Sequence, residues 1–154
     1  MEQHVISRKD PRYVVIDAAA FASKNLYNAA LYEIRQSYIF EGHYFSYNEM
    51  DKRMQQHEAY KALPAKVAQR VLNQLDQNWR SFFAACKEYG QDPSKFMGPP
   101  RFPKYKHKTE GRNLLVYTDQ AVSNKALKRG LIQVSMLPIR VRTKQKSIDQ
   151  VRIV

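Results

Sequence analysis

The sequence predicts an α+β fold: a small bundle of two long helices and a shorter one, followed by a small sheet or barrel. Over two long stretches within the first 90 residues, apolar side chains recur every three or four positions, which is the period of a helix face. After residue 112 the period falls to two, which is typical of strands with one face in a core. Between these regions, residues 91–112 contain four prolines and two glycines, which exclude a helix or a central strand.

The N-terminal part is expected to begin with a short strand over residues 2–9. This strand has no hairpin partner nearby, so it must pair with a distant segment. Asp10 and Pro11 then form the pattern of an N-cap followed by a first-turn proline. The helix predicted from Pro11 to Phe40 is apolar over so much of its circumference that we expect it to be packed on two sides.

Two further helices are predicted before the proline-rich segment. Ser46 and Glu49 have the spacing of a capping box, so a short helix should run from Tyr47 to about Gln56. The longest helix is predicted from Leu63 to Tyr89, and Gly90 is placed to end it in a left-handed cap.

Cys86 is the only cysteine, so neither an intramolecular disulfide nor a cysteine-based zinc site can form. It falls on the apolar face of the long helix, which predicts a buried structural thiol.

The opposite face of the long helix carries amides and basic groups with few acids. That face is typical either of a solvated surface or of one that meets phosphates and base edges.

Charge is the strongest global signal. The chain has 26 Lys and Arg against 14 Asp and Glu, a net charge of +12. Residues 1–100 hold 13 basic and 11 acidic side chains, whereas residues 101–154 hold 13 basic and 3 acidic ones. This gradient favours a polyanionic partner, nucleic acid first and an acidic membrane surface second, although a cationic protein without such a partner is the alternative. No apolar run approaches a membrane span and no signal-peptide pattern is present, so we expect an intracellular setting.

The proline-rich segment alternates basic and aromatic residues. Such a loop suits tracking along a phosphate backbone, with Phe102 and Tyr105 as candidates for stacking on bases. The alternative, which the sequence leaves open, is a solvated linker whose aromatic rings are pinned to the helices. The side chains predicted to contact a nucleic-acid backbone are Arg70, Arg101, Lys104, Lys106, Lys108, Arg112, Lys128, Arg129, Arg140, Arg142 and Lys144.

Signatures of catalysis are missing. There is no glycine-rich phosphate loop, and the four histidines have no metal-ligand spacing. The acidic residues fall on predicted helix surfaces and loops, whereas a two-metal nuclease gathers several acids at one point. We therefore predict binding without chemistry, with no catalytic residue, no metal and no cofactor in this chain.

Five segments, in order along nearly the whole chain, resemble the N-terminal half of TnpB/OrfB-type proteins. These proteins are transposon-encoded RNA-guided DNA endonucleases of bacterial insertion sequences and are relatives of the type V CRISPR nucleases. The segments are LYNAALYEIRQ (26–36), SYNEM (46–50), LPAKVAQRVLNQLDQNWRSFF (63–83), PPRFPKYK (99–106) and NLLVYTDQA (113–121). Residues 1–16 depart most from the family pattern.

The resemblance implies a domain arrangement. A helical recognition domain, residues 10–90, would be inserted into a small antiparallel β-barrel, the wedge domain, formed by residues 1–9 and 113–154. Residues 91–112 would be the basic linker between them. The N-terminal strand would then find its distant partner among the strands after the linker.

The resemblance also implies partners and reading residues. In the family this half contacts a structured guide RNA and reads a short motif in double-stranded DNA. The positions that match the motif-reading residues are Tyr47, Lys66, Gln69, Thr118 and Asp119. Asp119 departs from the amide expected at its position. The chemistry of Gln69 agrees with such a role, because an amide side chain can read adenine with two hydrogen bonds.

The family's nuclease domain and its zinc ribbon have no counterpart in these 154 residues. We therefore expect a binding portion without cleavage of its own, working in the bacterial cytoplasm at the nucleoid, with a nuclease half supplied in cis or in trans. The alternative from a different class is a helical protein–protein interaction or regulatory domain whose basic charge serves solubility.

Overall fold

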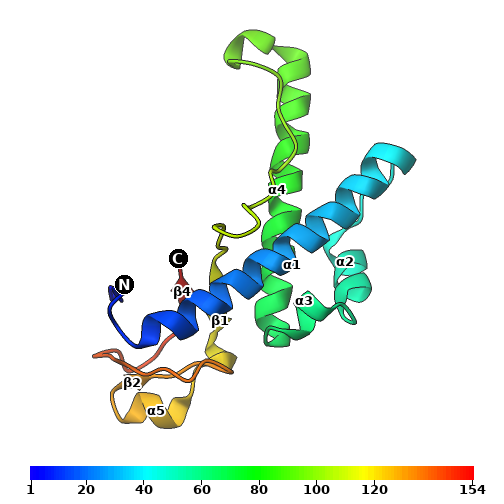
Figure 1. Ribbon diagram of the computed structural model, residues 1–154. Helices are drawn as coiled ribbons and strands as arrows, with labels where there is room; N and C mark the ends of the chain where they lie inside the picture. The colour runs from blue at the N-terminus through cyan, green and yellow to red at the C-terminus, as the bar shows by residue number, and fades with distance from the viewer.

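The computed structural model describes residues 1–154 and confirms the α+β fold (Figure 1). Two long helices, α1 (Arg12–Glu41) and α4 (Ala65–Gln91), cross each other. The short helices α2 (Tyr47–Met54) and α3 (Glu58–Lys61) lie between them in the chain. None of the helices is both long enough and apolar enough to cross a membrane.

The core forms where the apolar faces of α1 and α4 meet. Leu26 and Leu31 of α1 are fully buried, as is Trp79 of α4. The capping box of α2 is present as predicted: Glu49 N–H donates to Ser46 Oγ, and Ser46 N–H donates to Glu49 Oε2 at 2.8 Å. The three predicted helices therefore all form, with ends within a few residues of those expected.

The second half of the chain contains two separate two-stranded antiparallel sheets. Strand β1 (Leu115–Thr118) pairs with β4 (Gln150–Ile153), and β2 (Leu131–Ile132) pairs with β3 (Val141–Arg142). The 3₁₀ turn η2 (Asp119–Ala121) and the short helix α5 (Asn124–Lys128) connect β1 to β2. The strands are thus antiparallel, as expected, but form two small sheets rather than a closed barrel.

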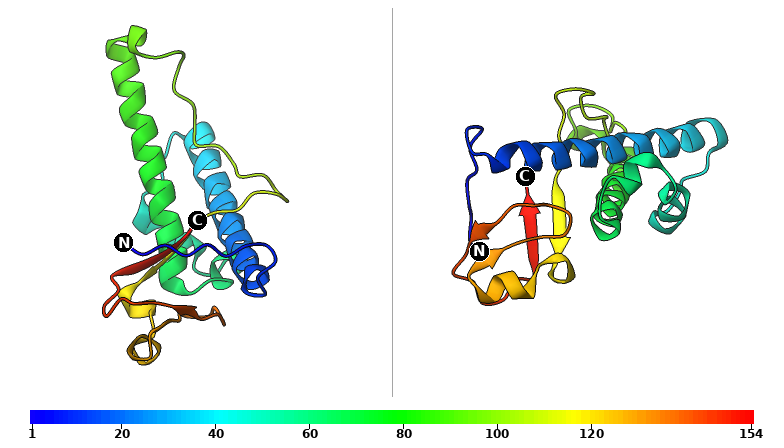
Figure 2. Two further views of the ribbon diagram at one scale, coloured as in Figure 1. Left: turned by 90° about the vertical axis from the view of Figure 1, so that its left-hand side faces the viewer. Right: turned by 60° about the horizontal axis from the view of Figure 1, so that its bottom comes forward.

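The predicted N-terminal strand over residues 2–9 is wrong, because these residues enter no sheet. The segment does lie beside the β region, as Figure 2 shows. A side-chain hydrogen bond holds its start there, because Thr143 donates to Glu2 Oε2 at 3.0 Å. Just after the segment, Arg12 Nη1 of α1 donates to the Arg140 carbonyl at 2.9 Å. Val5 is 96% exposed, so the segment buries too little apolar surface to compensate for the entropy of ordering a strand.

Three details at helix ends and faces differ from the prediction. Gly90 is helical, α4 continues to Gln91, and Asp92 ends it without a left-handed residue. The left-handed glycine cap is found instead at Gly42, with φ 68°, after α1. Cys86 is exposed rather than buried, because α4 projects beyond the elements that cover its N-terminal half.

The start of α1 also shifts by one residue. Its N-cap is Pro11, which makes no side-chain cap bond, and Asp10 precedes it. The Asp10 carboxylate still accepts a hydrogen bond from the Arg12 backbone N–H at 2.9 Å. The expected chemistry at this helix end is therefore retained one position earlier.

The linker that follows α4 begins with the 3₁₀ turn η1 (Pro93–Lys95) and returns between α4 and α1 (Figures 1 and 2). Its main chain is tied to α1. Asn28 donates to the Lys106 carbonyl and accepts from the Lys106 N–H, both at 2.9 Å. The buried Lys24 ammonium donates to the Lys108 carbonyl. These bonds fix the path of the linker along the helices.

The end of the linker is also fixed. The Asn113 side-chain amide donates to Ser23 Oγ at 3.1 Å and to Gln74 Oε1 at 3.0 Å. Asn113 and Ser23 are buried, so these bonds satisfy polar groups that would otherwise be costly. One side chain thereby joins the linker to both long helices immediately before β1.

Candidate nucleic-acid interface

The first turns of α4 lie beside the end of β1. The Lys66 ammonium donates a hydrogen bond to Gln120 Oε1 in η2. Lys66, Asp119 and Gln120 are all exposed. The structure therefore brings the predicted reading residue Lys66 next to the predicted strand-end pair Thr118 and Asp119.

Sequence reasoning missed Gln120. An amide was expected at the strand end, and Asp119 occupied that position instead. The structure places an amide one residue later, in contact with Lys66. The neighbouring glutamine in the sequence was the signal that could have identified it.

Thr118 and Asp119 differ in the exposure of their side-chain polar groups. The Thr118 hydroxyl oxygen is buried and has no hydrogen-bond partner, whereas Asp119 is exposed. A buried hydroxyl group without a partner is unusual and carries a desolvation cost. Of this predicted pair, only Asp119 presents its polar side-chain group at the surface.

Tyr47 and Gln69 both lie near the buried side chain of Tyr60. The Tyr60 hydroxyl donates to Asp51 Oδ1 at 2.9 Å and also interacts with the Gln69 side chain. Burial, together with the hydrogen bond to Asp51, raises the pKa of Tyr60 to about 12. The Tyr60 side chain therefore stays protonated and neutral at physiological pH.

Tyr47 lies close to the same acid. Burial raises the pKa of Tyr47, the Asp51 charge raises it further, and the nearby Arg70 charge opposes both effects. Gln69 is half-buried and Arg70 is exposed on the adjacent position of α4. Of the predicted contacts, Tyr47, Gln69 and Arg70 thus lie together, and Lys66 stands one turn earlier on the same helix. We call Tyr47, Lys66, Gln69, Arg70, Asp119 and Gln120 the reading edge.

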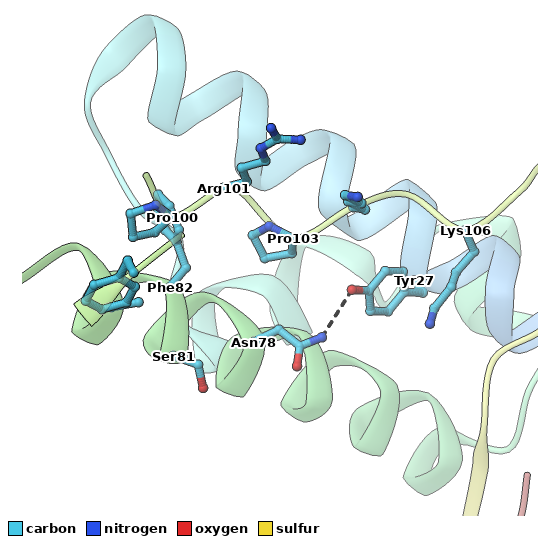
Figure 3. Close-up of a pocket in the computed structure, with 11 residues that line it drawn as sticks. Tyr27, Asn78, Ser81, Phe82, Pro100, Arg101, Pro103 and Lys106 are labelled. Atoms are coloured by element: carbon cyan, nitrogen blue, oxygen red, sulfur yellow. Dashed lines mark hydrogen bonds between the residues drawn. The ribbon is translucent and has the colours of Figure 1, made fainter. Parts of the chain in front are cut away.

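A groove separates α4 from the linker (Figure 3). Its volume is about 580 Å³, and three predicted backbone-contacting cations line it: Arg101, Lys104 and Lys106. No carboxylate is among the lining residues, which also include Phe82 and Asn78. The groove thus combines positive charge with apolar walls.

A second group of cations lies at α5. A cavity of about 180 Å³ is lined by Arg129 and Arg140, both predicted, and by Lys125, which was not. Ser123 and Gln133 supply neutral polar groups, and no carboxylate lines the cavity. We call Lys125, Arg129 and Arg140 the α5 cluster.

The remaining predicted cations do not share one environment. Arg112 is engaged within the fold: its Nε donates to Asp17 Oδ1 at 2.7 Å, and its Nη1 donates to the Thr109 and Gly111 carbonyls. The Asp17 carboxylate raises the pKa of Arg112. The exposed cations are Lys108, Lys128, Arg142 and Lys144. Arg112 thus joins the linker to α1 through these hydrogen bonds.

Phe102 and Tyr105, the two candidates for stacking on bases, lie in different environments. Phe102 packs within an aromatic cluster, with ring centroids 5.3 Å from Trp79, 5.0 Å from Phe82 and 5.9 Å from Tyr38. Tyr105 is 44% exposed, and the Arg35 guanidinium lies 5.1 Å from its ring centroid. For Phe102 the structure favours the alternative of a ring pinned to the helices, whereas Tyr105 remains at the surface.

No group of three or more His, Cys, Asp or Glu side chains is arranged to hold a metal ion. The sequence matches no model of a known protein family, and a search of curated proteins finds no significant match. The resemblance to TnpB-type proteins therefore stays a prediction.

Proposed function

We propose that this chain is the nucleic-acid-binding portion of a TnpB-like protein. It binds double-stranded DNA through the reading edge and structured guide RNA through its basic surfaces, without catalytic activity of its own. The proposal includes a bacterial cytoplasmic setting at the nucleoid and a nuclease half supplied in cis or in trans.

The observation that carries the proposal is the contact between Lys66 and Gln120. It places cationic and amide groups from two distant parts of the chain on one exposed edge. Amides and cations are the groups that read base edges in the major groove and contact phosphates. The groove cations and the α5 cluster, neither of which has a carboxylate neighbour in its cavity, supply charge for the backbone.

The proposed roles divide between affinity and specificity. Gln69 reads a base, and Arg70 contacts the backbone beside it. Lys66 reaches either an acceptor on a base edge or a phosphate oxygen. The Asp119 carboxylate, the one acid of the edge, would accept from a cytosine amino group and repel phosphates.

Substitution of Gln69 tests the reading role. Gln69→Ala should relax the sequence preference measured on a library of randomised duplexes, while overall affinity falls little. Gln77→Ala is the matched control, because Gln77 is an exposed amide on the same helix outside the reading edge. Uniform weakening on all sequences, or equal effects of the two substitutions, would contradict base reading by Gln69.

One observation favours the second candidate, a protein–protein interaction domain. The C-terminal part of α1 exposes three large apolar side chains: Tyr32 (54%), Ile39 (47%) and Phe40 (75%). Helical spacing places them on one side of the helix, and exposed apolar groups of this kind are found at protein interfaces. A substitution such as Phe40→Ser should leave DNA affinity unchanged if this surface serves a protein partner.

A further inference from the structure

We propose that the groove between α4 and residues 99–106 of the linker binds an unpaired nucleotide of a single nucleic-acid strand. The phosphate would lie against Lys104 and Lys106, and the base would lie against the apolar walls. The inference rests on the proposed function only in that the partner is nucleic acid. The groove is distinct from the reading edge and is predicted to take a strand that is not base-paired.

The walls of the groove are rigid. Pro100 and Pro103 form part of one wall, and the rings of the prolines fix their backbone φ angles (Figure 3). Phe102, between them, is anchored among the aromatic rings of the core. Asn28 holds the main chain of Lys106 with two hydrogen bonds of 2.9 Å. A preformed site of this kind loses little conformational entropy when it binds a ligand.

The positive charge of the groove is not offset locally. Lys106 extends from the linker toward Tyr27, and its ammonium lies 5.3 Å from the centroid of the Tyr27 ring (Figure 3). Lys104 lines the same cavity, which has no acidic residue. Arg101 also lines the groove, but its side chain points away from Tyr27 in Figure 3, so the proposal assigns the phosphate to the two lysines. A cationic cavity with low-dielectric walls concentrates anions such as phosphate.

The floor provides a polar group for a base. Asn78 is exposed and donates one hydrogen bond, from Nδ2 to the Tyr27 hydroxyl at 3.1 Å (Figure 3). Its Oδ1 and second Nδ2 proton remain available as an acceptor and a donor. Phe82 and Phe96 are half-buried and supply aromatic surface in the same cavity. Aromatic contact with a base is the sequence-tolerant part of single-strand binding.

Size selects against a duplex. The groove is an open depression of about 580 Å³ rather than an enclosed cavity. It accommodates one nucleotide, whereas a double helix can only pass over the opening. The predicted occupant is therefore a nucleotide from a loop, an overhang or a displaced strand.

The first test removes charge. The full 154-residue chain is titrated with fluorescently labelled ten-nucleotide DNA and RNA strands of one sequence, across a salt series. Lys104→Gln with Lys106→Gln should reduce the salt slope by about 0.7, and affinity roughly 5-fold at 0.1 M salt, because the two lysines share one phosphate and each single-strand phosphate contact contributes about 0.7 to the slope. The Asn28 bonds use only the main chain of Lys106, so the fold should persist.

The matched control is Lys52→Gln with Lys87→Gln, which removes the same charge from two exposed lysines outside the groove. An unchanged slope in this control and a reduced slope in the groove variant support the site. Equal losses in both variants, or no loss in the groove variant, would overturn it. Comparison of the DNA and RNA strands shows which sugar the groove prefers.

The second test fills the groove and keeps every cation. Ala85 lines the cavity and Ala84 does not, so Ala85→Trp should weaken single-strand binding at least 10-fold while Ala84→Trp has little effect. Equal behaviour of the two variants would show that only surface charge matters and would overturn the proposal. Competition by inorganic polyphosphate as strong as that by the oligonucleotide would do the same, since polyphosphate has no base.

Duplex reading by the reading edge and single-strand binding by the groove can be contradicted independently of each other. Gln69→Ala should change duplex selectivity and leave single-strand affinity intact. Ala85→Trp should have the opposite pattern. Loss of duplex binding with the single-strand results intact would contradict the proposed function and leave the groove assignment standing.

Discussion

The ammonium group of Lys66, in the first turn of α4, donates a hydrogen bond to the side-chain carbonyl oxygen of Gln120, 54 residues later in the chain. The contact joins the start of a helix in the bundle to the turn after β1. We infer that Gln120 positions Lys66 for DNA, so the two residues should act as a unit.

A double-mutant cycle tests this coupling. Lys66→Ala should weaken duplex binding, and Gln120→Ala should weaken it less, because the cation remains. The double variant should be no weaker than Lys66→Ala alone, since residues that act together are not additive. Affinities from anisotropy titrations measure the cycle, and strictly additive losses would contradict the coupling.

Asp76 should stabilise the helical bundle through two hydrogen bonds. It is buried and accepts hydrogen bonds from the Tyr44 hydroxyl at 2.6 Å and from Arg80 Nε at 2.8 Å. Asp76→Ala leaves the Tyr44 hydroxyl without its partner and should lower the free energy of unfolding by about 1.5–3 kcal/mol. Urea unfolding measures the change.

Arg80→Ala is the companion variant. The Arg80 side chain is 72% exposed, so solvent screens its ion pair and the loss should stay below about 1 kcal/mol. If Arg80→Ala costs as much as Asp76→Ala, then the ion pair rather than the Tyr44 hydrogen bond carries the stability.

The start of α1 should respond to acid. Hydrogen bonds from Arg12 lower the pKa of Asp10 from its ordinary value of 3.8 to about 2. Because the folded pKa is the lower one, this contribution to stability is present above pH 4 and is lost as the pH falls toward 2. The difference in melting temperature between wild type and Asp10→Asn should therefore shrink between pH 4 and pH 2, and a difference that is constant over this range would contradict the assignment.

Cys86 should react in the native state. It is exposed on α4, so one thiol per chain should be modified by a thiol reagent without denaturant. Unfolding in urea should raise the rate only modestly. A thiol that reacts only after the chain unfolds would contradict the exposed position. It would instead support the buried position that the helical pattern predicted.

The helices were predictable because their information is local. The three-and-four spacing of apolar residues predicted α1 and α4, and the Ser46 and Glu49 pair predicted the start of α2. The β region was predicted less well, since strands of two to four residues leave a short pattern and their pairing depends on distant segments. The same limit explains residues 2–9, which were predicted as a strand that needed a distant partner but enter no sheet.

The candidate site was predictable in its residue types but not in its contacts. A basic, aromatic linker indicated a charged surface, yet only packing shows that Phe102 is an anchor and that Arg112 is paired with Asp17. Burial of Cys86 depended on which elements cover the end of α4, which a helical period does not encode. To predict Gln120 as a site residue, one would need to know where β1 ends in the folded structure.

Duplex DNA binding across a salt series tests the central claim most directly. If the α5 cluster and the reading edge contact phosphates, log affinity should fall with log salt with a slope of about −3 or steeper, because each contact to a B-form duplex contributes about −0.9. Arg129→Gln with Arg140→Gln should reduce the slope by about 2. A slope near zero, unchanged by these substitutions, would contradict the assignment of this chain as a nucleic-acid-binding protein.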